Sequence, residues 1–256
     1  MERIGLEIRS KSLHEIKDDP YHVLSIVLNR KKVETIIDAG ASIGETSQKL
    51  VSIFPNAKVH AIEPYEPFCH LIRELKKEQP RVIEHQVALS DNDGVEELNI
   101  NKSKGTNSLL GSAQEAKNLY GSELDTTGKV KVKTQKIDSF ITENKIDKID
   151  ILKLDLQGNE YAALTGAKNT LEEGKIKVIM CEILFANHYK NQSDPVKLLE
   201  LLIGRHDFEI FSFYQSHYHR GKLLQTDAIL IHASIIKDVL KSAKKGFHAH
   251  SKLPLV

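Results

Sequence analysis

The feature that most constrains the fold is an alternation of short apolar runs with segments of helical periodicity. Val33–Ala39, Lys58–Glu63 and Arg81–Ala88 have the length and apolar content of strands. The segments between them, Thr46–Phe54 and Pro67–Lys77, carry apolar residues at helical spacing. Repeats of strand and helix build a parallel sheet whose crossover helices cover its faces. The sequence therefore predicts a doubly wound α/β fold.

The same alternation returns in the second half of the chain. Ile149–Asp155 and Val178–Leu184 are predicted strands, and Glu160–Leu171 is a predicted helix. Phe208–Tyr214 and Thr226–His232 are two further strands, joined by a polar connection too short for a helical crossover. Such a connection predicts a hairpin, which places one antiparallel strand at the edge of the sheet. We expect a mostly parallel seven-stranded sheet with one antiparallel edge strand.

An insertion interrupts the alternation after the third strand. Val95–Ile100 and Val130–Ile137 have strand character and flank a polar stretch, Lys102–Gly128. Lysines occupy the open face of the second of these strands, which is typical of an edge protected against aggregation. We predict an inserted hairpin and expect most of the polar stretch to be a mobile loop that covers a site.

Composition places the chain among ordinary globular proteins. Its 256 residues are 40% hydrophobic and 28% charged, with a formal net charge of +1. This balance provides no global field that attracts nucleic acid, and no apolar stretch approaches the roughly 20 residues of a membrane helix. The two cysteines and the absence of an apolar signal core predict a soluble, cytoplasmic protein. We divide the chain into a helical lead-in (1–32), one domain (33–246) and a C-terminal tail (247–256).

Carboxylates follow the predicted parallel strands where the strands end. Four of these strands have a carboxylate at their last residue or within two residues of it, namely Asp38, Glu63, Asp155 and Glu182. One such carboxylate is most simply a helix cap or a solvated residue. Open α/β sheets bind ligands at the carboxyl ends of their strands, so four carboxylates there predict a binding site.

The loop Asp38–Gly44 indicates which ligand that site holds. Its glycines, Gly40 and Gly44, do not match the G-x-G-x-x-G fingerprint of dinucleotide sites. Asp38 would repel a pyrophosphate and would suit an ammonium or a sulfonium. Glu63, at the end of the next strand, is placed to accept hydrogen bonds from ribose hydroxyls. Together these residues favour S-adenosyl-L-methionine over a dinucleotide.

Three motifs resemble those of the FkbM-type methyltransferases. They are Ile37–Gly44, Val87–Asp91 and Leu152–Glu160, which occur in that family's order and spacing. The resemblance covers residues 33 to 184. It departs from the family at Gln157, where many members carry Glu.

The resemblance implies a class I methyltransferase (Rossmann-like) fold, S-adenosyl-L-methionine as methyl donor, and O-methylation of hydroxyls on sugars or natural products. It implies that the glycine loop approaches the methionine part, Glu63 the ribose, Ala88 and Leu89 the adenine, and Asp155 the transferred methyl. The predicted cofactor-binding residues are Asp38, Gly40, Ala41, Ser42, Ile43, Gly44, Glu63, Pro64, Ala88, Leu89 and Asp155.

Methyl transfer to an alcohol is helped by a base that takes the hydroxyl proton. Asp155, Glu182 and His188 are the candidates at the predicted sheet edge. Asp155 and Glu182 also offer hard oxygen ligands, but without a third ligand they do not predict a metal.

Two polar segments have both a functional and a plain interpretation. Thr106–Ser108 and His217–His219 are either contacts for a polyhydroxyl acceptor or solvated turns. The histidines of the segment 247–250 fit a polar tail better than a metal site.

Two other function classes remain open at the level of sequence. A nicotinamide-dependent oxidoreductase shares the fold and Glu63, but the chain lacks the glycine fingerprint and a clear Tyr-x-x-x-Lys pair. A non-catalytic nucleoside-binding module also shares the fold. As partner we expect a small-molecule hydroxyl acceptor, and neither nucleic acid nor membrane. The acceptor's identity and the oligomeric state stay open.

Overall fold

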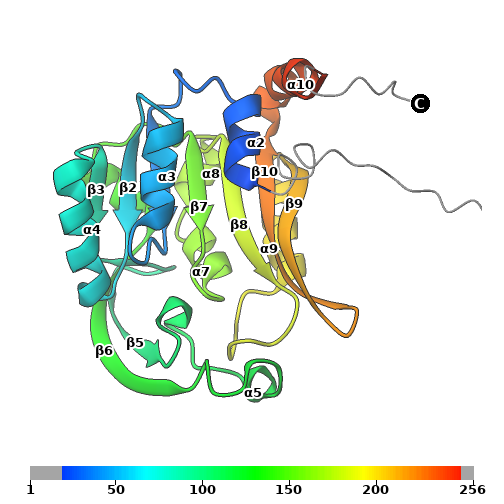
Figure 1. Ribbon diagram of the computed structural model, residues 1–256. Coiled ribbons are helices and arrows are strands. Elements are labelled where there is room, and N and C mark those ends of the chain that lie inside the picture. The colour runs from blue at the N-terminus through cyan, green and yellow to red at the C-terminus, as the bar shows by residue number, and fades with distance from the viewer. Residues whose placement is uncertain (1–18, 249–256) are drawn as a thin grey trace, which may run out of the picture.

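The computed structural model describes residues 19–248, which are organised around a seven-stranded sheet (Figure 1). The strands lie in the order β3-β2-β1-β7-β8-β10-β9. Their bounds are β1 Thr35–Ala39, β2 Lys58–Ile62, β3 Val82–His85, β7 Ile151–Leu154, β8 Val178–Leu184, β9 Phe208–His219 and β10 Lys222–His232. The first five pair in parallel, which confirms the predicted α/β class.

The predicted hairpin is present, but its antiparallel strand is not the edge strand. β10 runs antiparallel to both of its neighbours, β8 and β9. β9 takes the edge, so the antiparallel strand lies one position further inside than the sequence predicts. Burial explains the order, because Ala228–Ile231 of β10 is fully buried whereas most of β9 is exposed.

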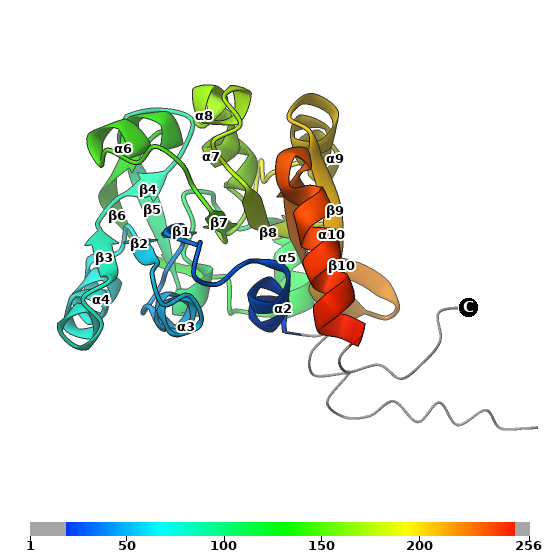
Figure 2. The same cartoon turned by 90° about the horizontal axis from the view of Figure 1, so that it is seen from above.

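Helices cover both faces of the sheet, as Figure 2 shows. One face carries α2 (Pro20–Val27), α3 (Glu45–Ile53), α4 (Glu66–Glu78) and α10 (Ala233–His248). The other carries α6 (Ile137–Glu143), α7 (Glu160–Thr165), α8 (Lys168–Glu172) and α9 (Pro195–Leu199), and η2 (Glu200–Arg205) continues α9. Of the predicted lead-in, α2 is described and packs beside α3 and α10, whereas residues 1–18 lie outside the described part.

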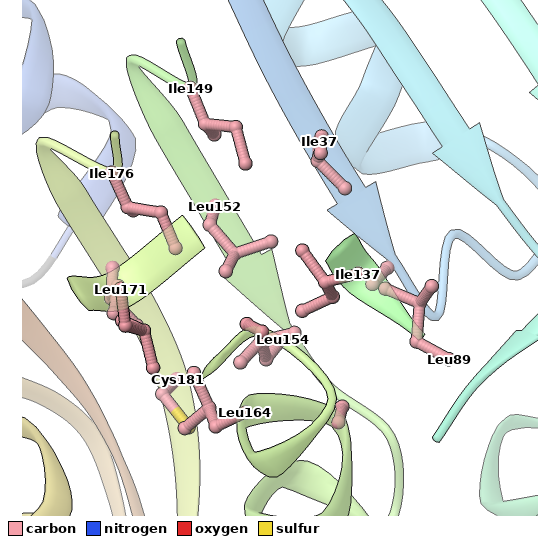
Figure 3. Close-up of a cluster of buried hydrophobic side chains, with 14 of the residues drawn as sticks. Ile37, Leu89, Ile137, Ile149, Leu152, Leu154, Leu164, Leu171, Ile176 and Cys181 are labelled. Atoms are coloured by element: carbon pink, nitrogen blue, oxygen red, sulfur yellow. The ribbon is translucent and has the colours of Figure 1, made fainter. Parts of the chain in front are cut away.

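Two apolar clusters lie on the two faces of the sheet. Alternate residues of a strand point to opposite faces, so Ile36 of β1 joins the cluster under α2 and α3, and Ile37 joins the other. Figure 3 shows the second cluster, in which Ile37, Leu152 and Leu154 pack against Ile137. Both clusters stop at the carboxyl ends of the strands, where polar side chains begin.

The insertion forms a second, three-stranded sheet. β5 (Gly94–Asn101) and β6 (Thr126–Gln135) pair antiparallel, as predicted. The predicted third strand, Arg81–Ala88, is divided, because it ends as β3 at His85 and its last residue, Ala88, begins β4 (Ala88–Leu89), which pairs with β6. Figure 1 shows this insertion below the carboxyl ends of the parallel strands.

The polar stretch inside the insertion is not one open loop, contrary to the prediction. It contains the short helix η1 (Lys104–Thr106) and the helix α5 (Gln114–Tyr120). Its middle is held to the loop that follows β7, because the Ser108 hydroxyl donates to the carbonyl of Gln157 at 2.8 Å. Its last three residues, Thr126–Gly128, already belong to β6.

Among residues 19–248, no helix combines the length and apolarity that a membrane crossing requires. The predicted tail lies almost wholly outside the described residues, so the structure says nothing of His250.

Candidate functional site

The carboxyl ends of the parallel strands border a cavity, which we name the main cavity. Seven of its lining residues are predicted site residues, namely Gly40, Ser42, Glu63, Pro64, Ala88, Leu89 and Asp155. Apolar side chains of the insertion, Leu98 and Leu109, line it as well. The space is about 650 Å³ with its open mouth, which lies within the range of small-molecule and cofactor sites.

Gly40 brings two strand ends into backbone contact at this cavity. It has φ +76°, and a Cβ atom there would lie 1.9 Å from the carbonyl oxygen of Asp155. The amide of Asp155 in turn donates to the carbonyl of Ala39 at 3.1 Å. Any side chain at position 40 would separate the loops after β1 and β7, so the glycine is required sterically.

Most of the other groups of the glycine loop pack against neighbouring elements and do not line the main cavity. The amides of Gly40 and Ala41 both donate to the carbonyl of Ile62, so they are already used. Ala41 is buried in the cluster under α3, and Ile43 is partly exposed. Gly44, with φ +89°, lets α3 begin against α4, because its Cβ would fall 2.9 Å from Leu75.

Glu63 presents a fixed carboxylate to the main cavity. Its Oε2 accepts from the amide of Ser42 and its Oε1 from the amide of Tyr65, each at 2.9 Å. Burial raises the pKa of Glu63 to about 7, although both amides act in the opposite direction. Each carboxylate oxygen keeps a lone pair for a further donor, so the group is prepared to accept hydroxyls.

Asp38 does not face the ligand with an unpaired carboxylate, contrary to the interpretation of the sequence. It is fully buried, its Oδ2 accepts from the Ser47 hydroxyl at 2.6 Å, and its Oδ1 lies 3.4 Å from Lys153 Nζ. Within the described chain, Oδ1 has no hydrogen-bond partner. The charge of Asp38 therefore acts on the site through Lys153.

Lys153 is a site residue that the sequence analysis missed. Its Nζ lies 3.3 Å from Asp155 Oδ2 and 3.2 Å from the carbonyl oxygen of Gly40. Burial alone would lower the pKa of Lys153, but the carboxylates of Asp155 and Asp38 outweigh it and raise the pKa. A lysine within the apolar run Ile151–Leu154 was the available signal, because a buried lysine needs a charged partner.

The loop after β7 is held by Glu160. Glu160 is fully buried, and its Oε1 accepts from the amides of Leu156 and Gly158. Burial raises the pKa of Glu160 to about 7. The loop needs this support because Gln157 and Gly158 have left-handed backbone, at φ +53° and +97°.

Gln157 connects the two carboxylates at the ends of β7 and β8. Its Nε2 donates to Asp155 at 2.7 Å and lies 3.4 Å from Glu182 Oε2, and its Oε1 accepts from the Tyr189 hydroxyl. Glu182 is 8% exposed and also accepts from Gln225. Burial, followed by the charge of Asp155, raises the pKa of Glu182 well above its ordinary value.

A second cavity, which we name the acidic cavity, opens on the other side of Asp155. The side chains that matter in it are Tyr21, Lys153, Asp155, Glu182, Gln215 and Asp227. Its space is about 590 Å³ with its mouth. Asp155, whose side chain is 40% exposed, lines both cavities, so it stands where two ligands would meet.

His188 lies apart from both cavities as they are formed by the described residues. It is buried, and its ring nitrogens are hydrogen-bonded to the Tyr120 hydroxyl and to the Ala186 carbonyl. Burial lowers the pKa of His188. In this arrangement the ring connects α5 to the segment after β8.

The two polar segments also differ in position. Asn107 and Ser108 line the main cavity beside Lys104 and Gly105, which places the insertion over the site. His217–His219 lies near the end of the β9–β10 hairpin, which extends beyond the sheet in Figure 1, and Tyr218 is largely exposed. In the described part of the chain, no group of three or more His, Cys, Asp or Glu side chains could hold a metal.

Comparison with known proteins adds to this geometry. Residues 38–210 match the methyltransferase FkbM domain. The chain is 27% identical over 189 residues to the 2-O-methyltransferase NoeI of Sinorhizobium fredii (strain NBRC 101917 / NGR234). The match covers 71% of this chain and 76% of NoeI.

A solved structure shares the fold. The methyltransferase FkbM from Methylobacillus flagellatus KT superimposes with a TM-score of 0.51 at 20% identity. The match covers 86% of this chain and 49% of that one, so the present chain spans about half of its length.

Proposed function

The chain belongs to the FkbM methyltransferase family, and we propose that this S-adenosyl-L-methionine-dependent O-methyltransferase acts on a hydroxyl of a sugar or a glycosylated natural product. NoeI, whose name describes a 2-O-methyltransferase, supports the choice of oxygen as acceptor atom. The net charge of +1 and the carboxylates of the acidic cavity favour a small acceptor over nucleic acid.

The observation that carries the proposal is the position of Glu63 beside the glycine loop. Its two oxygens are oriented by backbone amides and face a cavity with apolar walls. A carboxylate at the end of the second strand is suited to the two hydroxyls of a ribose. The residues present therefore fit a nucleoside, held by Gly40, Ser42 and Glu63 with Ala88 and Leu89 beside the base.

The sulfonium of the cofactor supplies an activated methyl group, so the protein mainly contributes positioning and a proton acceptor. When bound, the cofactor would supply this methyl group to the acceptor oxygen, and the electron pair of the broken carbon–sulfur bond would stay on sulfur; Gly40, Ser42 and Glu63 would hold its nucleoside. The acceptor hydroxyl must also lose its proton for a neutral ether to form.

We assign that proton to Asp155. It borders both cavities, and Lys153 and Gln157 hold its two oxygens in place. Glu182 lies beside Asp155 in the acidic cavity, and burial and the charge of Asp155 raise its pKa, so that it holds a proton more readily than an exposed carboxylate. His188 has no part in this proposal, since both ring nitrogens are occupied.

Calorimetry with S-adenosylhomocysteine and with NAD tests the cofactor. We expect saturable binding of S-adenosylhomocysteine and none of NAD, and the reverse result would favour an oxidoreductase. Transfer of a radiolabelled methyl group to a panel of methyl pyranosides then tests the acceptor class. Binding without any transfer to hydroxyl compounds would favour a non-catalytic module.

A further inference from the structure

The acidic cavity brings together carboxylates from three neighbouring strands. Asp227 of β10 and Glu182 of β8 are direct partners in the sheet register. Asp155 directly follows Leu154, the partner of Cys181, which precedes Glu182. Alternation along the strands places all three side chains on the face that carries α2 and α3. They therefore form one acidic wall beneath Tyr21.

The charges in this wall are not balanced. Lys153 is the cation of the cavity, and it already pairs with the buried Asp38 as well as with Asp155. Within residues 19–248, the carboxylate of Asp227 makes no hydrogen bond and no ion pair. Its surroundings withdraw it from water, and this burial raises its pKa to about 6. A carboxylate left in this state inside a cavity is available to a ligand that donates hydrogen bonds.

The backbone is irregular at the same place. Asp227 faces Tyr214 and Gln225 faces His217, so Gln215 and Ser216 stand opposite the single residue Thr226. Gln215 also has left-handed backbone, with φ +49°. Bulges of this kind re-aim side chains and occur beside active sites. Here the bulge accompanies the entry of Gln215 into the acidic cavity.

We propose that the acidic cavity is the acceptor subsite and that it binds one neutral polyhydroxyl ring, held by Asp227 and Gln215, with its reacting hydroxyl at Asp155. This inference rests on the proposed function. Carboxylates and an amide match a ring that offers several hydroxyl donors. The same carboxylates repel phosphorylated or carboxylated acceptors, which excludes anionic sugars. Asp155 then separates the acceptor from the nucleoside.

The test uses the full chain saturated with S-adenosylhomocysteine and a set of uncharged methyl pyranosides as probes. Binding is followed by saturation-transfer NMR, and cofactor affinity by calorimetry. We expect at least one pyranoside to bind wild type and to bind at least tenfold more weakly to Asp227→Asn and to Gln215→Ala. Affinity for S-adenosylhomocysteine should stay within twofold. Glu209→Gln, an exposed carboxylate on β9, is the matched control and should behave as wild type.

The possible failures are distinguishable. If no pyranoside binds the saturated wild type, or binding survives both substitutions, the acceptor subsite is overturned. If Asp227→Asn, shown to be folded by its melting curve, loses S-adenosylhomocysteine instead, the cavity belongs to the cofactor. Gln215→Ala answers the same question if Asp227→Asn does not fold. Failure of wild type to bind S-adenosylhomocysteine would overturn the proposed function itself.

Discussion

The backbone of Gly40 passes so close to Asp155 that a Cβ atom on Gly40 would lie 1.9 Å from the Asp155 carbonyl oxygen. This contact joins the loops after β1 and β7, which lie far apart in sequence. It also sets the distance between the glycine loop and the carboxylate that borders both cavities.

Gly40→Ala should disturb both the fold and the cofactor site. The new methyl group meets backbone that cannot rotate away, and φ +76° is unfavourable for alanine. We expect the free energy of unfolding to fall by roughly 2–4 kcal/mol and S-adenosylhomocysteine binding to be lost. Urea unfolding and calorimetry measure the two effects. Gly128→Ala is the control, because nothing lies within 4 Å of its Cβ position.

Glu63→Gln should weaken the nucleoside site while preserving the fold. Glutamine has one acceptor oxygen, so one of the two amides, of Ser42 or of Tyr65, loses its partner, and the ribose loses a carboxylate. We expect at least tenfold weaker binding of S-adenosylhomocysteine by calorimetry, which is about 1.4 kcal/mol or more. Glu66→Gln, on the exposed start of α4, should bind normally. Unchanged affinity in Glu63→Gln would remove Glu63 from the site.

Gln157→Glu tests how this chain tolerates the residue that many family members carry. The substitution replaces a donor by a carboxylate between Asp155 and Glu182. We expect the free energy of unfolding to fall by about 1–3 kcal/mol at pH 8, and by less at pH 5, where the cluster holds more protons. Gln114→Glu, at the exposed start of α5, is the control. Equal stability of Gln157→Glu and wild type at both pH values would contradict the repulsion.

A histidine pair on β2 and β3, in which His60 is buried and His85 half-buried, should make the protein sensitive to acid. His60 Nδ1 and His85 Nε2 lie 3.0 Å apart, so one ring must donate and the other accept. Burial, followed by nearby positive charge, lowers both pKa values from 6.5 to about 4. Because the unfolded chain binds these protons more readily, the stability from the pair is complete above pH 6.5 and is lost as the pH falls towards 4.

His85→Gln checks this pH dependence, since glutamine does not titrate. Unfolding by urea between pH 7.5 and 4.5 should show a smaller loss of stability on acidification than in wild type. His22→Gln, an exposed histidine of α2, should leave the wild-type dependence unchanged. A loss in His85→Gln as large as in wild type would show that other groups cause the acid sensitivity.

Much of the fold was predictable because its elements are local patterns. The strand ends that carry Asp38, Glu63, Asp155 and Glu182 follow from apolar runs and the residues that end them. Which of β9 and β10 takes the edge of the sheet was not predictable. A short connection allows either order, and the burial that decides between them is a property of the folded structure. The helix α5 was also missed, because its segment lacks a clear apolar period.

The sequence by itself determined which residues gather at the carboxyl edge of the sheet, since a strand delivers its last residue wherever it ends. Only the tertiary structure decided what each of them does there. Asp38 is paired with Lys153, His188 with Tyr120, and Asp227 stands beside Glu182 without a partner of its own in the described chain. These pairings join residues far apart in sequence, and periodicity along the chain carries no information about such contacts.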